Sequence, residues 1–352
     1  MLFIKIARAS VIAAAIFLLP ACGGGTASSV LPTSMNVAAS TLDTITPSRN
    51  NRRSPSPAPS ASPSAVPSAV PSASPSSNPV PPSWIWGVTS DDPTVNTAQQ
   101  VAALSSFSAR ATVRTVFDLP SGGGPYAADY VSSIAQIAPV ADVMGLTNDS
   151  STMAQTSLAT IQSRIAEYLA ALSSNVKIWE IGNEVNGNWL GTGVVPKVQA
   201  EYDAVTAAGK PTAITFYYEN PPTPGYDMLP WIDANIPVGN PMRAGLNYVL
   251  VSYYEDQNGG HQLTQTELNT IFSGLAARFP NAKVGFGEFG YGGAIPSETA
   301  TGNAKRAALL QRFYGYRVPS VPAYIGGGFY WHLRQTMSPK TLPDWTVLNA
   351  LM

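Results

Sequence analysis

Two glutamates that end apolar runs are the residues of this chain best suited to chemistry. Glu184 ends the run WEIGNE (179–184), and Glu288 ends the run KVGFGE (283–288). Both runs have the composition of short buried strands. Because a buried charge without a partner is costly, polar residues at the ends of such strands indicate a site. A pair of carboxyls, one protonated and one ionised, can combine general acid–base catalysis with nucleophilic attack.

The elements that must bring these glutamates together alternate regularly along residues 84–352. Apolar runs typical of strands alternate with helical patterns, which predicts a (β/α)8 TIM barrel, an α/β fold of this size. An open, doubly wound sheet is the alternative, but the TSDDP segment (89–93) is not the glycine-rich loop that it would need after its first strand. The expected strands are residues 85–89, 112–117, 141–146, 176–182, 213–218, 248–253, 283–288 and 327–331. The expected helices are residues 98–108, 128–137, 158–172, 198–207, 226–234, 265–279, 304–316 and 345–351.

A TIM barrel carries its active site at the C-terminal ends of the strands, so polar and aromatic residues at those ends are the site candidates. They are Arg114, Asp118, Asn148, Asn183, Glu184, Glu219, Tyr253, Tyr254, Glu288, Trp331 and His332.

The motifs after the fourth and on the seventh expected strand resemble those of the clan A glycoside hydrolases. GNE (182–184) and GEFG (287–290) carry the resemblance, which extends over the chain from residue 84 onward. It implies that Glu184 is the acid/base, that Asn183 contacts the 2-hydroxyl of the sugar, and that Glu288 is the nucleophile. If the two carboxyls lie about 5–5.5 Å apart, direct attack by the ionised one retains the anomeric configuration.

Further substrate-site residues follow from the same resemblance. Arg114 resembles the arginine that supports the nucleophile, and Trp331 resembles the platform beneath the sugar. Either Tyr253 or Tyr254 corresponds to the tyrosine that binds the nucleophile. Strand alternation lets only one of the two face inward, and we favour Tyr253.

Two more residues extend the predicted binding surface. Trp189 belongs to an aromatic group near the expected mouth, where rings can stack on sugars. We include His332 among the residues expected to bind substrate, although packing is the alternative role for it.

The substrate is less closely specified than the mechanism. EFG (288–290) is similar to cellulases and mannanases, NEVNG (183–187) to mannanases and galactanases, and SYY (252–254) to galactanases. We expect an endo-acting hydrolase of a β-linked glucan, mannan or galactan. The alternatives are a hydrolase of the producer's own exopolysaccharide or surface glycan, and a non-catalytic glycan-binding lipoprotein.

The composition of the chain limits the kinds of binding partner to be expected. The net charge is −1, with no basic run for nucleic acid. A single cysteine and two histidines make a structural zinc site improbable, so we expect no metal and no cofactor. A monomer that binds a polysaccharide or oligosaccharide is the expected state.

The N-terminal quarter of the chain has the composition of a targeting and spacer region. Residues 1–22 combine basic residues with an apolar run and end in LPAC, which resembles a bacterial lipobox with Cys22 as the lipidated residue. Residues 23–83 are rich in Pro, Ser and Ala, which predicts a disordered, extended linker. We therefore expect a protein of the bacterial cell envelope, anchored to the outer membrane through lipid on Cys22, with plain secretion as the alternative.

Overall fold

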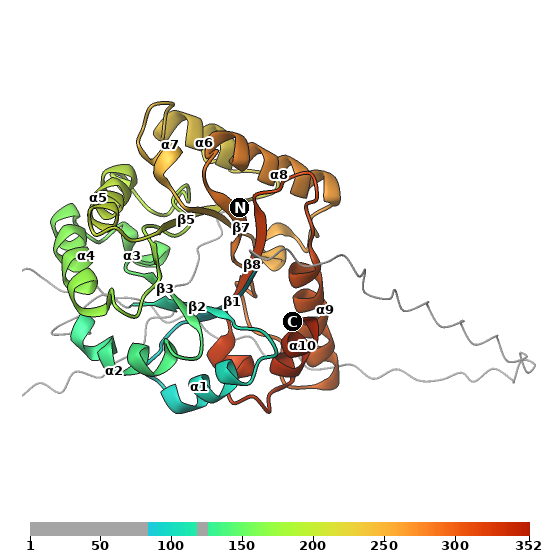
Figure 1. Cartoon of the computed structure of the whole chain (residues 1–352). Coiled ribbons are helices and arrows are strands. Elements are labelled where there is room, and N and C mark those ends of the chain that lie inside the picture. The colour runs from blue at the N-terminus through green and yellow to red at the C-terminus, as the bar shows by residue number, and fades with distance from the viewer. Residues whose placement is uncertain (1–83, 118–125) are drawn as a thin grey trace, which may run out of the picture. The chain divides into compact units, whose positions relative to one another are not determined.

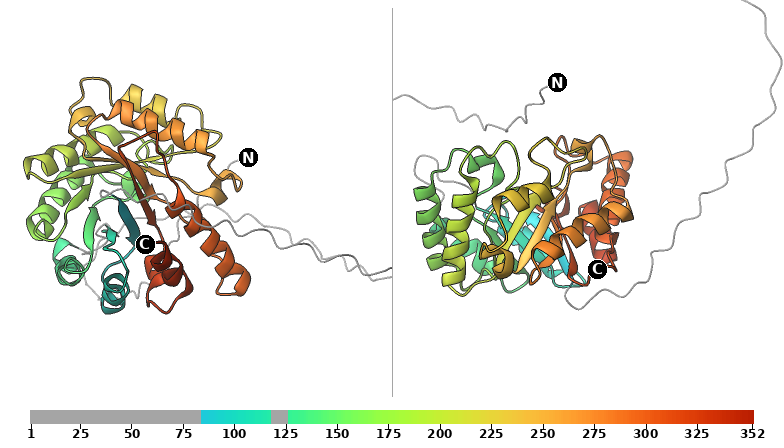
Figure 2. Two further views of the ribbon diagram at one scale, coloured as in Figure 1. Left: turned by 45° about the vertical axis from the view of Figure 1, so that its right-hand side comes forward. Right: turned by 90° about the horizontal axis from the view of Figure 1, so that it is seen from above.

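The computed structural model describes residues 84–117 and 126–352, and these form a closed barrel of eight parallel strands in the order β1 to β8. Helices follow the strands and lie around the outside of the barrel (Figure 1). Figure 2 shows the same arrangement from two further directions. The predicted TIM barrel is confirmed.

The eight strands lie close to their predicted positions. They are β1 (Ile85–Ser90), β2 (Thr112–Val116), β3 (Asp142–Leu146), β4 (Ile178–Glu180), β5 (Thr212–Tyr217), β6 (Tyr248–Ser252), β7 (Lys283–Glu288) and β8 (Tyr324–Tyr330).

The main helices also agree with the sequence pattern, and α4 has the predicted bounds. They are α1 (Thr97–Ser105), α2 (Ala127–Ile137), α4 (Leu158–Leu172), α5 (Val194–Ala207), α6 (Met228–Asn235), α8 (Gln265–Arg278), α9 (Ala300–Gly315) and α10 (Pro343–Leu351). The sequence did not predict four shorter elements, which are α3 (Ser150–Met153), α7 (Met242–Gly245), the 3-10 turn η1 (Glu255–Asn258) and the π-helical turn η2 (Leu333–Met337).

Two hydrophobic clusters hold the barrel together. The larger one fills the space between the strands and the helices. The smaller one consists of Met144, Ile178, Ala213, Leu250 and Phe329, one side chain from each of five strands. Successive side chains on a strand face opposite ways. Residues two positions before or after one of these five on the same strand therefore also face the barrel interior.

The strand that carries Glu288 departs from regular geometry in its pairing with β6. The register between β6 and β7 shifts between Val251 and Ser252, which brings Ser252 opposite Glu288. On β7, a Cβ added to Gly287 would lie 2.5 Å from Thr215 Oγ1 and 2.7 Å from Leu250 Cβ. A residue without a side chain is therefore needed directly before Glu288.

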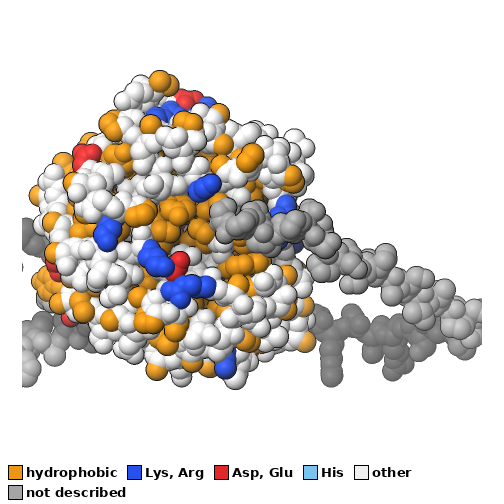
Figure 3. Space-filling model, viewed as in Figure 1, with side chains coloured by type: hydrophobic (Ala, Val, Ile, Leu, Met, Phe, Trp, Pro, Cys, Tyr) orange, Lys and Arg blue, Asp and Glu red, His pale blue; other side chains and the backbone are white. Residues whose placement is uncertain are grey.

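The face of the barrel seen in Figure 1 has hydrophobic side chains at its centre, with separate Lys and Arg side chains among and around them (Figure 3). Arg110 and Lys177, on the segments that lead into β2 and β4, both bind Asp142, at 2.7 and 2.6 Å. The positive charges of these two residues are therefore partly balanced by one carboxylate of the protein.

The predicted signal peptide, the lipobox at Cys22 and the linker 23–83 lie outside the described residues, as does Asp118. Within residues 84–117 and 126–352, no helix combines the length and the apolarity that a membrane crossing requires.

Candidate active site

The backbone after β4 is held in a strained conformation that sets the direction of Glu184. Glu184 has φ of 50°, in the left-handed region that residues other than glycine seldom adopt. Its carbonyl accepts a 2.7 Å bond from Gly187 N–H. The Asn186 side chain also bonds both the N–H and the C=O of Tyr217 at the end of β5. Strain of this kind persists only where its surroundings enforce it, and it is frequent at functional sites.

Glu288 accepts hydrogen bonds from three side chains on three other segments. Its Oε2 accepts from Arg114 Nη1 at 2.8 Å and from Asn183 Nδ2 at 3.0 Å, and its Oε1 accepts from Tyr254 OH at 2.7 Å. All four side chains are buried. One guanidinium and two neutral donors aimed at a single carboxyl favour its ionised form.

Arg114 is itself fixed by a second carboxylate, that of Glu180. Its Nε lies 2.5 Å from Glu180 Oε2, and Thr215 Oγ1 donates to Glu180 Oε1 at 2.5 Å. Burial on its own lowers the pKa of Arg114, but Glu180 and Glu288 raise it above its ordinary value. Arg114 is therefore a permanent cation placed between two carboxylates.

Glu184 is held by hydroxyls on both of its oxygens. Ser150 Oγ donates to Oε2 and Ser252 Oγ donates to Oε1, each at 2.8 Å. Its neighbour Asn183 is held by the same segment, because Asn183 Nδ2 also donates to Asp149 Oδ2 at 3.2 Å. The segment after β3 therefore supports both members of the Asn-Glu pair.

The two glutamates interact electrostatically. Burial raises the pKa of Glu288 to about 8, the positive charge of Arg114 opposes this rise, and the negative charge of Glu184 adds to it. Their protons therefore belong to the pair rather than to one residue. Burial, followed by the charge of Glu288, raises the pKa of Tyr254 well above its ordinary value, so that its hydroxyl stays a donor.

The tyrosine that binds Glu288 is Tyr254, which corrects the prediction of Tyr253. Leu250 lies in the barrel interior and Ser252 reaches Glu184, so that alternation along β6 turns Tyr253 outward. Tyr253 OH instead donates to the carbonyl of His261 at 2.9 Å, and its ring packs against Tyr218.

Trp331 and Trp189 each pack against a residue that interacts with one of the two glutamates. The Arg114 guanidinium carbon is 5.5 Å from the centre of the Trp331 ring. Trp189 packs edge-on against Tyr217, with ring centres 5.2 Å apart. Burial raises the pKa of Tyr217 above its ordinary value, and the negative charge of Glu184 raises it further.

The structure does not bring His332 into contact with the two glutamates. Its Nε2 accepts a 3.2 Å bond from the N–H of Tyr291, in the loop after β7. Burial lowers the pKa of His332 to about 4, so its ring is neutral and suited to this acceptor role. His332 thus supports the loop after β7.

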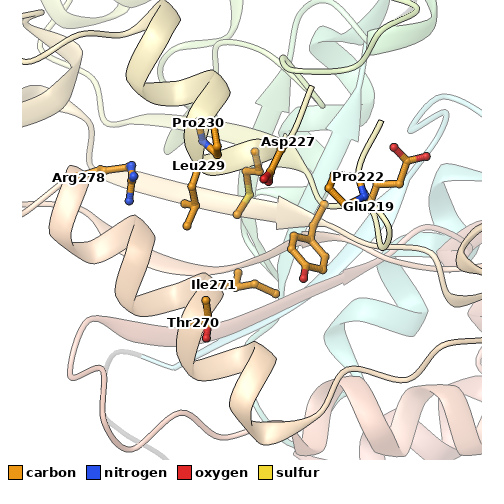
Figure 4. Close-up of a pocket in the computed structure, with 10 residues that line it drawn as sticks. Glu219, Pro222, Asp227, Leu229, Pro230, Thr270, Ile271 and Arg278 are labelled. Atoms are coloured by element: carbon orange, nitrogen blue, oxygen red, sulfur yellow. The ribbon is translucent and has the colours of Figure 1, made fainter. Parts of the chain in front are cut away.

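Two other strand-end candidates contact residues outside the glutamate pair. Asn148 is buried, and its Nδ2 contacts the sulfur of Met153. Glu219 bonds the backbone and hydroxyl of Thr223. It also lines a cavity of about 450 Å³ between α6, α8 and the segment after β5 (Figure 4). None of the residues that bind Glu184 or Glu288 lines this cavity.

Sequence reasoning missed Asp149, Ser150, Ser252 and Thr215, all of which bond to members of the site. The sequence did contain a signal for Ser252. It lies two positions after the apolar Leu250, so that strand alternation puts both side chains on the same face of β6. For Asp149 and Ser150 there was none, since a four-residue helix has no periodic pattern. Among the described residues, no group of three or more His, Cys, Asp or Glu side chains could hold a metal ion.

Comparison with known proteins gave structural similarity without a sequence match. No family model and no curated protein matches the chain. The chain is similar to a solved β-glycosidase, BGL167, with a TM-score of 0.50 and 10% identity over 72% of this chain and 87% of that one.

Two further solved structures are similar at lower TM-scores. One is a family GH128 endo-β-1,3-glucanase from Amycolatopsis mediterranei (TM-score 0.45, 12% identity, 76% of this chain and 99% of that one). The other is a family 1 β-glucosidase from Thermotoga maritima (TM-score 0.47, 13% identity, 72% and 89%). At these identities, the similarity to BGL167 establishes that the barrel fold is shared.

Proposed function

We propose that this protein is a retaining glycoside hydrolase that acts within chains of a β-linked glucan, mannan or galactan. The observation that carries the proposal is the network that joins Glu288 to Arg114, Asn183 and Tyr254, together with the electrostatic interaction between Glu288 and Glu184. Its members come from β2, from β7 and from the segments after β4 and β6, so the fold converges on this point. Two interacting carboxyls with different surroundings are what double displacement at an acetal requires.

The surroundings assign a role to each carboxyl. With one proton on the pair, the charged donor Arg114 favours placing the negative charge on Glu288 and the proton on Glu184. Protonating Glu184 also removes the charge that raises the pKa of Glu288. Glu288 is then the ionised nucleophile, and Glu184 is the acid that protonates the leaving oxygen.

Asn183 provides an acceptor for the substrate. Both neighbours of its Nδ2 are carboxylates, which orients the amide with nitrogen toward them. Its Oδ1 is buried with no hydrogen-bond partner in the part of the chain that the structure describes. Such a group is costly until a ligand donor reaches it, and a sugar hydroxyl would satisfy it. Trp331 supplies an aromatic ring beside Arg114, and such a ring can stack on a sugar.

We also propose that residues 1–22 direct export, that Cys22 carries a lipid and that residues 23–83 separate the barrel from the membrane. This arrangement suits an enzyme of the cell envelope whose substrate is an extracellular polymer. The basis is the N-terminal sequence alone.

A substrate screen tests the proposed activity. The full chain is incubated with β-glucan, β-mannan, xylan and β-galactan, and new reducing ends are measured in the presence and absence of a chelator. We expect one of these polymers to be cleaved into oligosaccharides, equally with and without chelator. Binding of a polymer without cleavage would instead indicate a glycan-binding protein, and loss of activity in chelator would contradict the mechanism.

The pH dependence of kcat/KM follows from the shared proton. Burial raises the pKa of Glu288 to about 8, and the negative charge of Glu184 adds to the rise, so one proton should stay on the pair until the pH approaches this value. Above this pH both carboxyls are ionised and no general acid remains, so kcat/KM should fall. At low pH Glu288 becomes protonated and kcat/KM should fall again, which gives a bell-shaped profile. A profile that still rises well above pH 8 would contradict this assignment.

A further inference from the structure

Each oxygen of the Glu184 carboxyl accepts a hydrogen bond from a serine hydroxyl, and the two serines come from different parts of the barrel. Ser252 is the last residue of β6, and Ser150 is the first residue of α3. Both distances are 2.8 Å. Neither serine belongs to the two motifs that contain the glutamates, since Ser150 precedes the Asn-Glu pair by more than thirty residues and Ser252 follows it by more than sixty.

Both serines are held where they are by their surroundings. Ser252 is 0% exposed and Ser150 is 6% exposed. Asp149 caps α3 by accepting from Ser151 N–H at 3.0 Å, and the same carboxylate also binds Asn183. The hydroxyls are therefore fixed in position before a substrate binds, while each O–H remains able to rotate about its C–O bond.

The chemistry of a serine hydroxyl differs from that of Arg114, the charged donor that binds Glu288. A serine hydroxyl can both donate and accept, whereas a guanidinium can only donate. Two hydroxyl donors suit an ionised carboxylate. When the carboxyl is protonated, its own O–H can donate to one serine after that serine's hydroxyl has rotated. The Ser150–Ser252 pair can therefore bind Glu184 in either protonation state.

Such a carboxyl is what the proposed reaction needs, and this inference rests on that proposed function. In the first step the glycosidic C–O bond breaks, a bond from Glu288 to the anomeric carbon forms, and the proton of Glu184 passes to the leaving oxygen. In the second step water attacks the anomeric carbon, its proton passes to Glu184, and the bond to Glu288 breaks. Glu184 thus alternates between acid and carboxylate in every turnover.

We propose that Ser150 and Ser252 are positioning residues that hold Glu184 in one orientation through both of its protonation states. Their hydroxyls rotate while the carboxyl remains aimed at the leaving oxygen and later at the attacking water. Ser150 in addition links Glu184 to the segment that binds Asn183, so the acid and its neighbouring amide move together.

Single alanine substitutions test this role. Ser150→Ala and Ser252→Ala should each lower kcat by about ten- to one-hundred-fold on the polymer cleaved by the full chain, the effect of losing one hydrogen bond to a charged group. The alkaline limb of the kcat/KM profile should move to higher pH in both variants, because the ionised carboxylate loses a donor. Ser150→Thr keeps the hydroxyl and should retain the wild-type profile.

Ser133→Ala is the matched control. Ser133 is buried in α2, but its hydroxyl donates to the carbonyl of Tyr130. Its substitution should leave both rate and pH profile unchanged, and thermal unfolding of every variant separates folding defects from loss of positioning.

The possible outcomes distinguish this inference from the proposed function. If the wild-type chain cleaves a polymer while both alanine variants keep its rate and pH profile, the role of the serines is overturned and the proposed function stands. If both variants are slower with an unshifted profile, the serines matter only for packing and the inference is again overturned. If the wild-type chain cleaves none of the polymers tested, the proposed function fails and the inference fails with it.

Discussion

Glu288→Ala should abolish polysaccharide hydrolysis, with kcat lowered by roughly ten-thousand-fold or more. Glu288 is the point on which Arg114, Asn183 and Tyr254 converge, and no other carboxylate receives these three donors among the residues described. Without it, the anomeric carbon has no nucleophile to form a covalent intermediate. The measurement is release of reducing ends from the polymer identified in the substrate screen, together with binding of the same polymer, which should persist.

Azide provides a direct test of the missing nucleophile. In Glu288→Ala, azide can enter the space left by the carboxylate and attack the anomeric carbon, giving a glycosyl azide of inverted configuration. The reaction needs a substrate with a good leaving group, and the product configuration can be assigned by NMR. Restored turnover with this product identifies position 288 as the nucleophile.

A second buried glutamate serves as the control for this substitution. Glu201 lies on α5, is 2% exposed, and accepts a 2.6 Å bond from Thr147. Burial raises its pKa to about 8, so Gln closely mimics the neutral acid. Glu201→Gln should keep activity within a few-fold of wild type. Unchanged activity in Glu288→Ala, or equal losses in the two variants, would remove Glu288 from the mechanism.

The barrel was predictable because local patterns and the global fold agree. Each strand is a short apolar run and each main helix has a period near 3.6 residues, and those signals need no knowledge of distant contacts. Of the eight strands, β4 falls furthest short of its predicted length, since it was expected at 176–182 and is found at Ile178–Glu180. The regular strand ends there, ahead of Asn183 and Glu184. The position of this end depends on tertiary contacts and not on the local preference of the residues for strand.

The site was predictable only where a polar residue interrupts an apolar pattern. Glu184, Glu288 and Arg114 do so, and the structure brings all three together. Ser150 and Asp149 lie in a loop where serine and aspartate are ordinary, so their bonds to Glu184 and Asn183 depend on three-dimensional placement. The choice between Tyr253 and Tyr254 required the inward position of Ser252, which fixes the phase of alternation.

Glu184→Ala should produce the second-largest loss, and its size should depend on the leaving group. General acid–base catalysis by a positioned side chain contributes about a hundred- to ten-thousand-fold. For the polymer, whose leaving group is a sugar alcohol, kcat/KM should fall by that amount. For an aryl glycoside with an acidic phenol, bond cleavage needs no protonation, so kcat/KM should change little while kcat falls because the second step lacks its base.

Azide again separates the two roles, now with the opposite stereochemistry. In Glu184→Ala the covalent intermediate on Glu288 still forms and accumulates, since water is not activated. Azide needs no general base, so it should raise kcat and give a glycosyl azide of retained configuration. The same reagent thus reports inversion in one variant and retention in the other only if Glu288 is the nucleophile and Glu184 the acid/base. Retention from Glu288→Ala together with inversion from Glu184→Ala would exchange the roles, and Arg114 would then support the acid instead of the nucleophile.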